Sequence, residues 1–187
     1  MYNTSDIRNG LKVEIDGAPF TVTYFQFVKP GKGTAFTRTK LKNLLTGNTI
    51  ERTFRTGEKL PPADVAEHEM QYMYTDANGS HFMNTESYEQ VAIQSDVIGD
   101  DSVYLLEGMN VNVLFYKGNP VNIDLPYFVE LEVTYTEPAV KGNTSQGALK
   151  EAETVTGARV MVPLFVETGD VLKVDTRTRE YVERVNR

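Results

Sequence analysis

Short runs of alternating apolar and polar residues, separated by turn signals, recur along this chain of 187 residues. The clearest run is FVELEVTYT, residues 128–136, in which Val129, Leu131 and Val133 alternate with polar residues. Because the side chains of a strand point alternately to its two faces, this pattern predicts a strand with one buried face. Many short strands with turns about every eight to twelve residues are typical of barrels and sandwiches, so the sequence predicts an all-β fold.

The other expected strands have the same character. They cover residues 11–15, 19–28, 34–45, 49–54, 70–75, 81–83, 110–116, 120–126, 158–166, 171–176 and 179–185. Residues 149–157 have some helix propensity, but Thr154-Val155-Thr156 favours a strand or loop there. Residues 100–108, DDSVYLLEG, predict a short helix that Asp100 or Ser102 caps and Gly108 ends.

The expected strands fall into three groups of about sixty residues, a size near the lower limit for independent folding. The sequence therefore predicts three small barrels, over residues 1–64, 65–128 and 129–187. The segment TGEKLPPAD, residues 56–64, carries two prolines and is typical of a boundary.

Charge is distributed unevenly along the chain, whose net charge is −7. Residues 1–64 carry +4, residues 65–128 carry −9 and residues 129–187 carry −2. An overall negative charge argues against nucleic-acid binding. The basic first third, in contrast, indicates either a polar interaction surface at one end of the molecule or a chance excess of basic residues on solvent-exposed faces.

The absence of cysteine fits a reducing compartment and removes thiol catalysis, disulfides and thiolate metal sites. No run approaches the ~18 apolar residues of a membrane span, and the start, MYNTSDIRNG, has no apolar core of a secretory signal. We expect a cytoplasmic protein without membrane association.

A lysine stands between two glycines in FVKPGKGTAF, residues 27–36. Its plainest interpretation is a hairpin turn with a solvated Lys32. A phosphate-binding loop of the GxxxxGK[ST] type is excluded because Gly33 follows the lysine. A GxGxxG motif is excluded because Phe36 stands where its last glycine would be. The sequence therefore indicates an exposed, mobile amine, which is a common target for covalent modification.

Further cations surround this loop. Lys29 precedes it, and Arg38, Lys40 and Lys42 alternate with Thr37, Thr39 and Leu41 in the strand expected after it. Alternation on a strand places Arg38, Lys40 and Lys42 on one face, which suits phosphates.

No catalytic constellation is apparent. His68 and His81 lack the dense spacing of metal ligands, and ordinary surface or strand histidines are the better interpretation. With no cysteine and no convincing Ser/His/Asp arrangement, the sequence predicts neither an enzyme nor a cofactor or metal site. The polar loop 141–147 and the Arg-rich end with Tyr181 suit either nucleic-acid contact or solvent.

Taken in order, several stretches resemble the bacterial elongation factor P family. FVKPGKGTAF resembles the family's modified-lysine loop. TGNTIERTFRTGEK, residues 46–59, resembles the end of the family's first domain. Residues 150–169 resemble the family's C-terminal signature. VDTRTREYVERV, residues 174–185, resembles the C-terminal end of the family's sequences. The resemblance spans the whole chain.

This resemblance implies three β-barrel domains, SH3-like (KOW-like) followed by two OB-type barrels, in an L-shaped, tRNA-like arrangement. It implies a monomer that binds the ribosome between the peptidyl and exit sites, beside peptidyl-tRNA. The loop lysine then reaches the tRNA acceptor end and helps peptide bonds form at consecutive prolines. A lysine-modifying enzyme resembling lysyl-tRNA synthetase is a further implied partner.

The family's functional positions carry over onto matching residues. Lys32 matches the modified residue, and Pro30, Gly31 and Gly33 shape its loop. The resemblance further implies ribosome or RNA contacts for Gly142, Asn143, Thr144, Tyr181 and Arg184. The chain departs from the family at Arg179, where glycine is frequent, and at Glu151 and Glu153, where proline and threonine are frequent.

The main alternative is a general OB-fold protein that binds single-stranded nucleic acid. Such a protein needs aromatic stacking platforms and a basic groove. The charge of −9 over residues 65–128 counts against this alternative.

Overall fold

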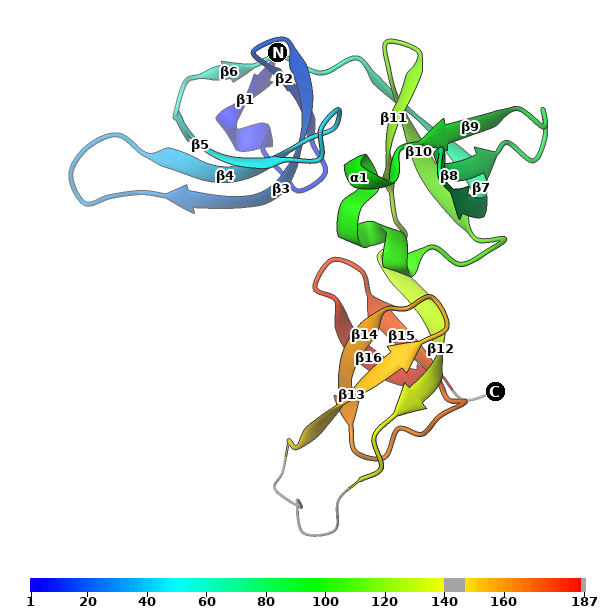
Figure 1. Cartoon of the computed structure of the whole chain (residues 1–187). Coiled ribbons are helices and arrows are strands. Elements are labelled where there is room, and N and C mark those ends of the chain that lie inside the picture. The colour runs from blue at the N-terminus through cyan, green and yellow to red at the C-terminus, as the bar shows by residue number, and fades with distance from the viewer. Residues whose placement is uncertain (140–146, 186–187) are drawn as a thin grey trace. The chain divides into compact units, whose positions relative to one another are not determined.

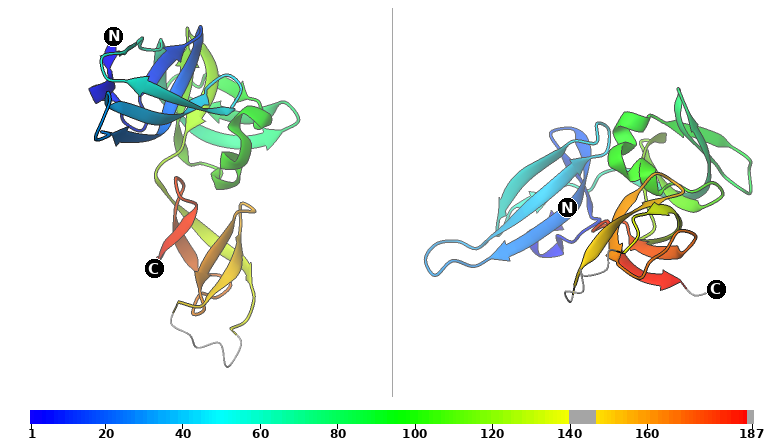
Figure 2. Two further views of the ribbon diagram at one scale, coloured as in Figure 1. Left: turned by 90° about the vertical axis from the view of Figure 1, so that its left-hand side faces the viewer. Right: turned by 60° about the horizontal axis from the view of Figure 1, so that its bottom comes forward.

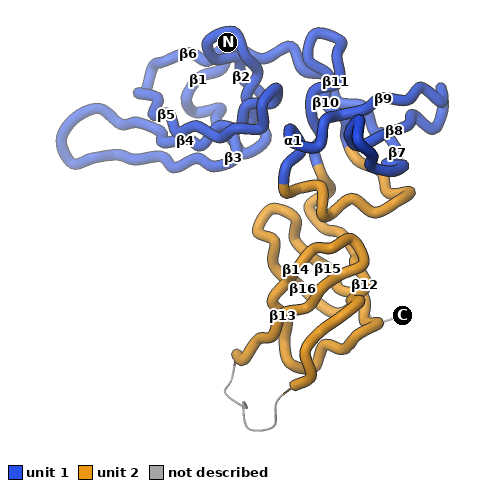
Figure 3. The backbone as a smooth tube through the Cα atoms, viewed as in Figure 1, with its two compact units in different colours: residues 1–99, 112–124 blue, residues 100–111, 125–187 orange. Residues whose placement is uncertain are grey.

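The computed structural model describes residues 1–139 and 147–185, and its regular secondary structure is mostly strand (Figures 1 and 2). The chain divides into two compact units (Figure 3). The first comprises residues 1–99 and 112–124, and the second comprises residues 100–111 and 125–187. The prediction of an all-β fold is confirmed.

The first barrel lies within the first unit and is built on a four-stranded antiparallel sheet. Its strands are β2 (Lys12–Ile15), β3 (Ala18–Val28), β4 (Phe36–Asn43) and β5 (Thr49–Arg55), in that order. A small sheet pairs β1 (Tyr2–Asn3) with β6 (Lys59–Leu60), and the 3₁₀ helix η1 covers Thr4–Asp6. The core contains Val13, Phe20, Val22, Leu41 and Phe54, so the inward side chains of each main strand meet in one cluster.

The middle barrel is a five-stranded sheet in the order β11-β10-β7-β8-β9. Its strands are β7 (Val65–Asp76), β8 (Gly79–Met83), β9 (Gln90–Ile93), β10 (Asn110–Tyr116) and β11 (Asn119–Asp124). The short helix α1 (Ser95–Ile98) and the 3₁₀ helix η2 (Gly99–Tyr104) join β9 to β10.

The third barrel lies in the second unit, with strands in the order β14-β13-β12-β15-β16. They are β12 (Phe128–Thr136), β13 (Leu149–Thr154), β14 (Arg159–Pro163), β15 (Val171–Asp175) and β16 (Glu180–Val185). Counted from the first strand of each, the middle and third sheets have the same strand order. Their edge strands, β9 with β11 and β14 with β16, also approach each other, so each sheet curls into a barrel of OB type.

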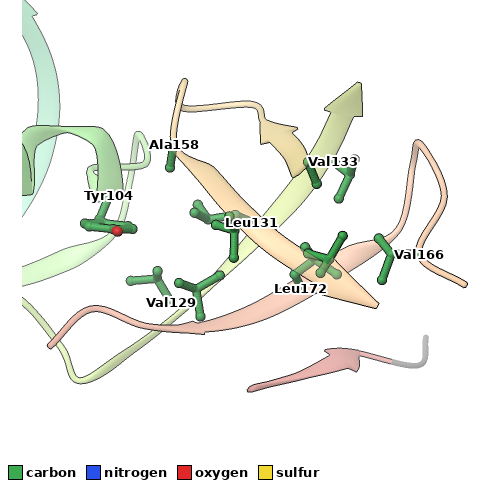
Figure 4. Close-up of a cluster of buried hydrophobic side chains, with 11 residues drawn as sticks. Tyr104, Val129, Leu131, Val133, Ala158, Val166 and Leu172 are labelled. Carbon is green, nitrogen blue, oxygen red and sulfur yellow. The ribbon is translucent and has the colours of Figure 1, made fainter. Parts of the chain in front are cut away.

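The alternation of apolar and polar residues along β12 explains how this strand contributes to the core of the third barrel (Figure 4). Val129, Leu131 and Val133 on β12 point inward and are at most 7% exposed, as the sequence pattern predicts. Tyr104 of η2 enters the same cluster at 2% exposure, and burial raises the pKa of its hydroxyl. The second unit therefore includes this 3₁₀ helix as part of its core.

The predicted helix over residues 100–108 is wrong in its limits. The helical segment begins at Ser95, α1 gives way to η2 at Gly99, and η2 ends at Tyr104. Gly99 has φ +64, a conformation that interrupts a right-handed helix. Beyond Tyr104 the chain turns, with the Met109 amide donating to the Leu106 carbonyl.

Most predicted strands are confirmed within a few residues, and residues 149–154 form a strand rather than a helix. The short strands β1, β6 and β9 were not predicted. The division at residues 64 and 128 and the L shape stay predictions. Within the described ranges, no helix has both the length and the apolar character needed to cross a membrane.

Two hairpin glycines offer a test of this packing. Gly79 has φ +121, and a Cβ there would lie 2.3 Å from the Ile93 carbonyl oxygen, whereas Gly118 has φ +84 and open space around it. Gly118→Ala is expected to cost only backbone strain, about 1 kcal/mol. Gly79→Ala is expected to cost on the order of 3 kcal/mol, because a backbone oxygen must also move. Denaturant titration measures both, and equal losses would contradict this packing at β9.

Candidate functional site

A long hairpin of β3 and β4 extends from the first barrel (Figure 1). The two strands pair from Phe20 opposite Asn43 to Val28 opposite Phe36. Val22 is buried, whereas Gln26 and Phe27 near the far end are exposed. At about 3.3 Å per residue, the paired strands continue roughly 20 Å past Val22. On the other side, buried Phe54 of β5 lies opposite Thr37, so the loop, residues 29–35, begins just beyond the end of the core.

The far end of this hairpin is braced by the next strand. β5 continues alongside until Arg55 lies opposite Phe36. The Thr56 amide and hydroxyl both donate to the Ala35 carbonyl at 3.0 Å. Because paired strands resist bending more than a free loop does, the loop begins from a firm base.

Lys32 is exposed at the tip of the loop, between Gly31 and Gly33. Gly33 has φ +102, which L side chains rarely adopt, so the loop depends on glycine there. Gly31 has no such backbone requirement, and a Cβ at either glycine would meet no other atom within 4 Å. Within residues 1–139 and 147–185, no carboxylate lies within ion-pairing distance of the Lys32 amine.

A cationic face follows the loop along β4. Arg38 and Lys40 are exposed and Lys42 is half-buried, while Thr37, Thr39 and Leu41 between them are buried. The Lys40 amine lies 4.0 Å from Glu51 and 5.8 Å from the centre of the Tyr24 ring. The shared face is as the sequence predicts, and its role in RNA binding stays a prediction.

Tyr24 also belongs to this face, and sequence reasoning missed it. A bulge between Val22 and Tyr24 shifts the register against β4, so that Tyr24 lies opposite Lys40. A bulge adds one residue and reverses the alternation beyond it. The letters TVTYFQF carry no signal that locates such a bulge.

The predicted contact residues near the C-terminus lie in the second unit. Tyr181, on β16, is half-buried and packs against the core of the third barrel. A guanidinium nitrogen of Arg184 lies 3.5 Å from Asp170, and its Cζ lies 5.0 Å from the Phe165 ring centre. Gly142, Asn143 and Thr144 lie outside the described residues.

Arg179 occupies a strained position, which accounts for the frequent glycine expected there. Its φ is +63, in the turn between β15 and β16, where a glycine carries less strain. Its guanidinium lies 3.5 Å from Asp100 and 3.7 Å from Asp101, both in η2. The arginine thus connects that turn to the helix that supplies Tyr104.

Neither histidine has metal-site surroundings. His81 Nε2 lies 2.8 Å from Asp76 Oδ1, and this hydrogen bond is the main cause of the lowered pKa of Asp76. The His68 ring meets the edge of Phe115 at 5.0 Å. In the part of the chain that the structure describes, no three metal-ligating side chains form a cluster.

Comparison with known proteins finds three family models along the chain. "Elongation factor P (EF-P) KOW-like domain" matches residues 3–60, "Elongation factor P (EF-P) OB domain" residues 65–123, and "Elongation factor P, C-terminal" residues 129–184.

Relatives match over nearly the full length. "Elongation factor P" of Moorella thermoacetica is 52% identical, covering 98% of this chain and 100% of its own. "Elongation factor P 2" of Protochlamydia amoebophila is 51% identical over 98% of this chain and 97% of its own. A solved "Eukaryotic translation initiation factor 5A from Methanococcus jannaschii" is 22% identical, with a TM-score of 0.48, over 66% of this chain and 90% of that one. At that score the likeness adds nothing to the family models.

The exposure of Lys32 predicts that its amine reacts quickly with reagents in solution. Lys32 is exposed, whereas Lys150 on β13 is only 9% exposed. Brief treatment with an amine-acylating reagent is expected to label Lys32 at least about tenfold faster than Lys150, because a buried amine must first be uncovered. Peptide mass spectrometry measures both sites, and equal labelling would contradict the exposed loop.

Proposed function

This chain belongs to the elongation factor P family, and from that premise we propose how its lysine hairpin acts in translation. The protein is a translation elongation factor that acts with the ribosome. We propose that it binds between the peptidyl and exit sites, beside peptidyl-tRNA, with the Lys32 loop directed at the acceptor end of that tRNA. The supporting observation is the exposed Lys32 in the loop that joins the paired strands β3 and β4.

The proposed effect is to speed peptide-bond formation at consecutive prolines. Proline is a restricted reactant, and poor alignment of a restricted reactant slows bond formation. Holding the tRNA end in place lowers the entropic part of the barrier without an acid, base or nucleophile. On this proposal the ribosome performs the chemistry and the factor is not an enzyme.

The loop suits entry into a narrow RNA cavity. Gly31 and Gly33 add no side-chain bulk beside Lys32, and Pro30 restricts the backbone just before them. The Lys32 amine pairs with backbone phosphate, and an added group would extend its reach and its hydrogen bonding. We propose Lys32 as a modification site for an enzyme resembling lysyl-tRNA synthetase.

Further contacts are proposed along the molecule. Lys29 and the cationic face of β4, Arg38, Lys40 and Lys42, meet RNA phosphates. Tyr181, Arg184 and the segment Gly142, Asn143 and Thr144 contact the ribosome or the tRNA. We propose a cytoplasmic monomer of three domains, with limits at residues 64 and 128.

Removing the amine tests the proposal. Lys32→Ala is expected to slow synthesis of a polyproline reporter roughly tenfold and to spare a proline-free reporter, because only a poorly aligned reaction needs the factor. Lys59→Ala, at an exposed lysine on β6 of the same barrel, is the matched control and is expected to keep the wild-type rate. Reconstituted translation measures the rates, and a wild-type polyproline rate for Lys32→Ala would contradict the proposal.

Gly31→Ala tests the steric requirement separately. The added methyl meets nothing in the free protein, so thermal stability is expected to stay unchanged. The polyproline rate is nevertheless expected to fall, because the methyl enlarges the tip that enters the cavity. Full activity of this variant would argue against entry into a narrow site.

A further inference from the structure

The turn between β4 and β5 lies against the middle barrel, within the same compact unit. Gly47 in this turn has φ +78, and a Cβ there would stand 2.7 Å from the Val97 carbonyl oxygen in α1. Real Cβ atoms essentially never approach another heavy atom so closely. Glycine therefore lets two backbones meet at this point.

A buried amide makes a second contact at the same place. Asn122 on β11 is 1% exposed, and its side-chain nitrogen donates to the Leu44 carbonyl at 3.3 Å. Its Oδ1 accepts from the Ile123 amide at 2.8 Å. Because a buried amide without partners is costly, this side chain favours one arrangement of the two barrels.

A lysine makes a third contact from another strand. Lys12 on β2 places its Nζ 3.0 Å from Asp124 and 3.3 Å from Glu67, both on strands of the middle barrel. Its side chain is only 14% exposed, so solvent screens these pairs less than it screens ordinary surface pairs.

The segment that connects the two barrels is also held. The Glu14 amide donates to the Pro61 carbonyl at 2.9 Å, on the side of the first barrel. The Lys117 amide donates to the Asp64 carbonyl at 3.1 Å, on the side of the middle barrel. The connection is therefore short and hydrogen-bonded at both ends, unlike a flexible linker.

We propose that these contacts form a junction that fixes the direction of the lysine hairpin, with Gly47, Asn122 and Lys12 as positioning residues. β4 begins beside the lysine loop and ends at the junction, so it acts as a lever (Figures 1 and 2). Its eight residues span about 25 Å, so a tilt of roughly 10° at the junction would move the loop about 4 Å. Displacements of about 1 Å can cost a positioned reaction a hundredfold. The inference rests on the proposed role of Lys32.

Two pairs of variants isolate the junction. Gly47→Ala is matched by Gly17→Ala, since Gly17 has nearly the same φ, +79, but nothing within 4 Å of an added Cβ. Lys12→Met removes both ion pairs, whereas Lys12→Arg keeps a cation that can pair with Glu67 and Asp124.

Spin-label distances report on the junction without the ribosome. The chain has no cysteine, so labels go on Glu58→Cys in the first barrel and Ser87→Cys in the middle barrel, both at exposed positions. We expect one narrow distance distribution for the wild type, Gly17→Ala and Lys12→Arg, and a broader or shifted one for Gly47→Ala and Lys12→Met. Identical distributions in all five proteins would overturn the proposal.

Translation of a polyproline template tests the consequence. At saturating factor, Gly47→Ala is expected to give a rate roughly tenfold below that of Gly17→Ala. A variant that is merely less stable regains its rate when more protein is added, whereas a misdirected hairpin does not. Broadened distances with an unchanged saturating rate would overturn the positioning role. Lys32→Ala leaves the junction intact. A wild-type polyproline rate for this variant would therefore contradict only the proposed function. The spin-label distances would still decide whether the junction fixes the hairpin.

Discussion

The ladder of backbone hydrogen bonds between β3 and β4 is the interaction on which the rest of this structure depends. It runs from Phe20 opposite Asn43 to Val28 opposite Phe36, and β5 pairs with β4 as far as Phe36. A loop of seven residues would otherwise be free to move over a wide volume. Pairing of the strands limits that freedom to the loop itself, where Lys32 is exposed between two glycines.

Such a scaffold suits a factor that aligns reactants. The described residues hold no metal-ligating cluster, and the histidine contacts are accounted for by local packing and hydrogen bonds. A paired hairpin with an exposed cationic tip supplies reach and charge instead. On our proposals, the junction at Gly47 and Lys12 sets the direction of that reach, and the ribosome performs the chemistry.

Much of this arrangement could be predicted from local patterns, because strand alternation and turn glycines act over a few residues. The strand at residues 128–136 and the shared face of Arg38 and Lys40 are examples. Features set by distant contacts could not be predicted. The bulge that turns Tyr24 toward Lys40, the burial of Tyr104 and the approach of Gly47 to Val97 all depend on partners far along the chain. Thr46-Gly47-Asn48 has the residue types of an ordinary exposed turn, so its sequence does not indicate a contact with another barrel.

On our proposal, Lys32 assists the reaction by reducing the freedom of the reactants. The most direct test is the temperature dependence of peptide-bond formation between two prolines on ribosomes with the wild-type factor and with Lys32→Ala. We expect the rate gained through Lys32 to come from a less unfavourable activation entropy, with little change in activation enthalpy. A gain that comes from a lower activation enthalpy at unchanged activation entropy would contradict it.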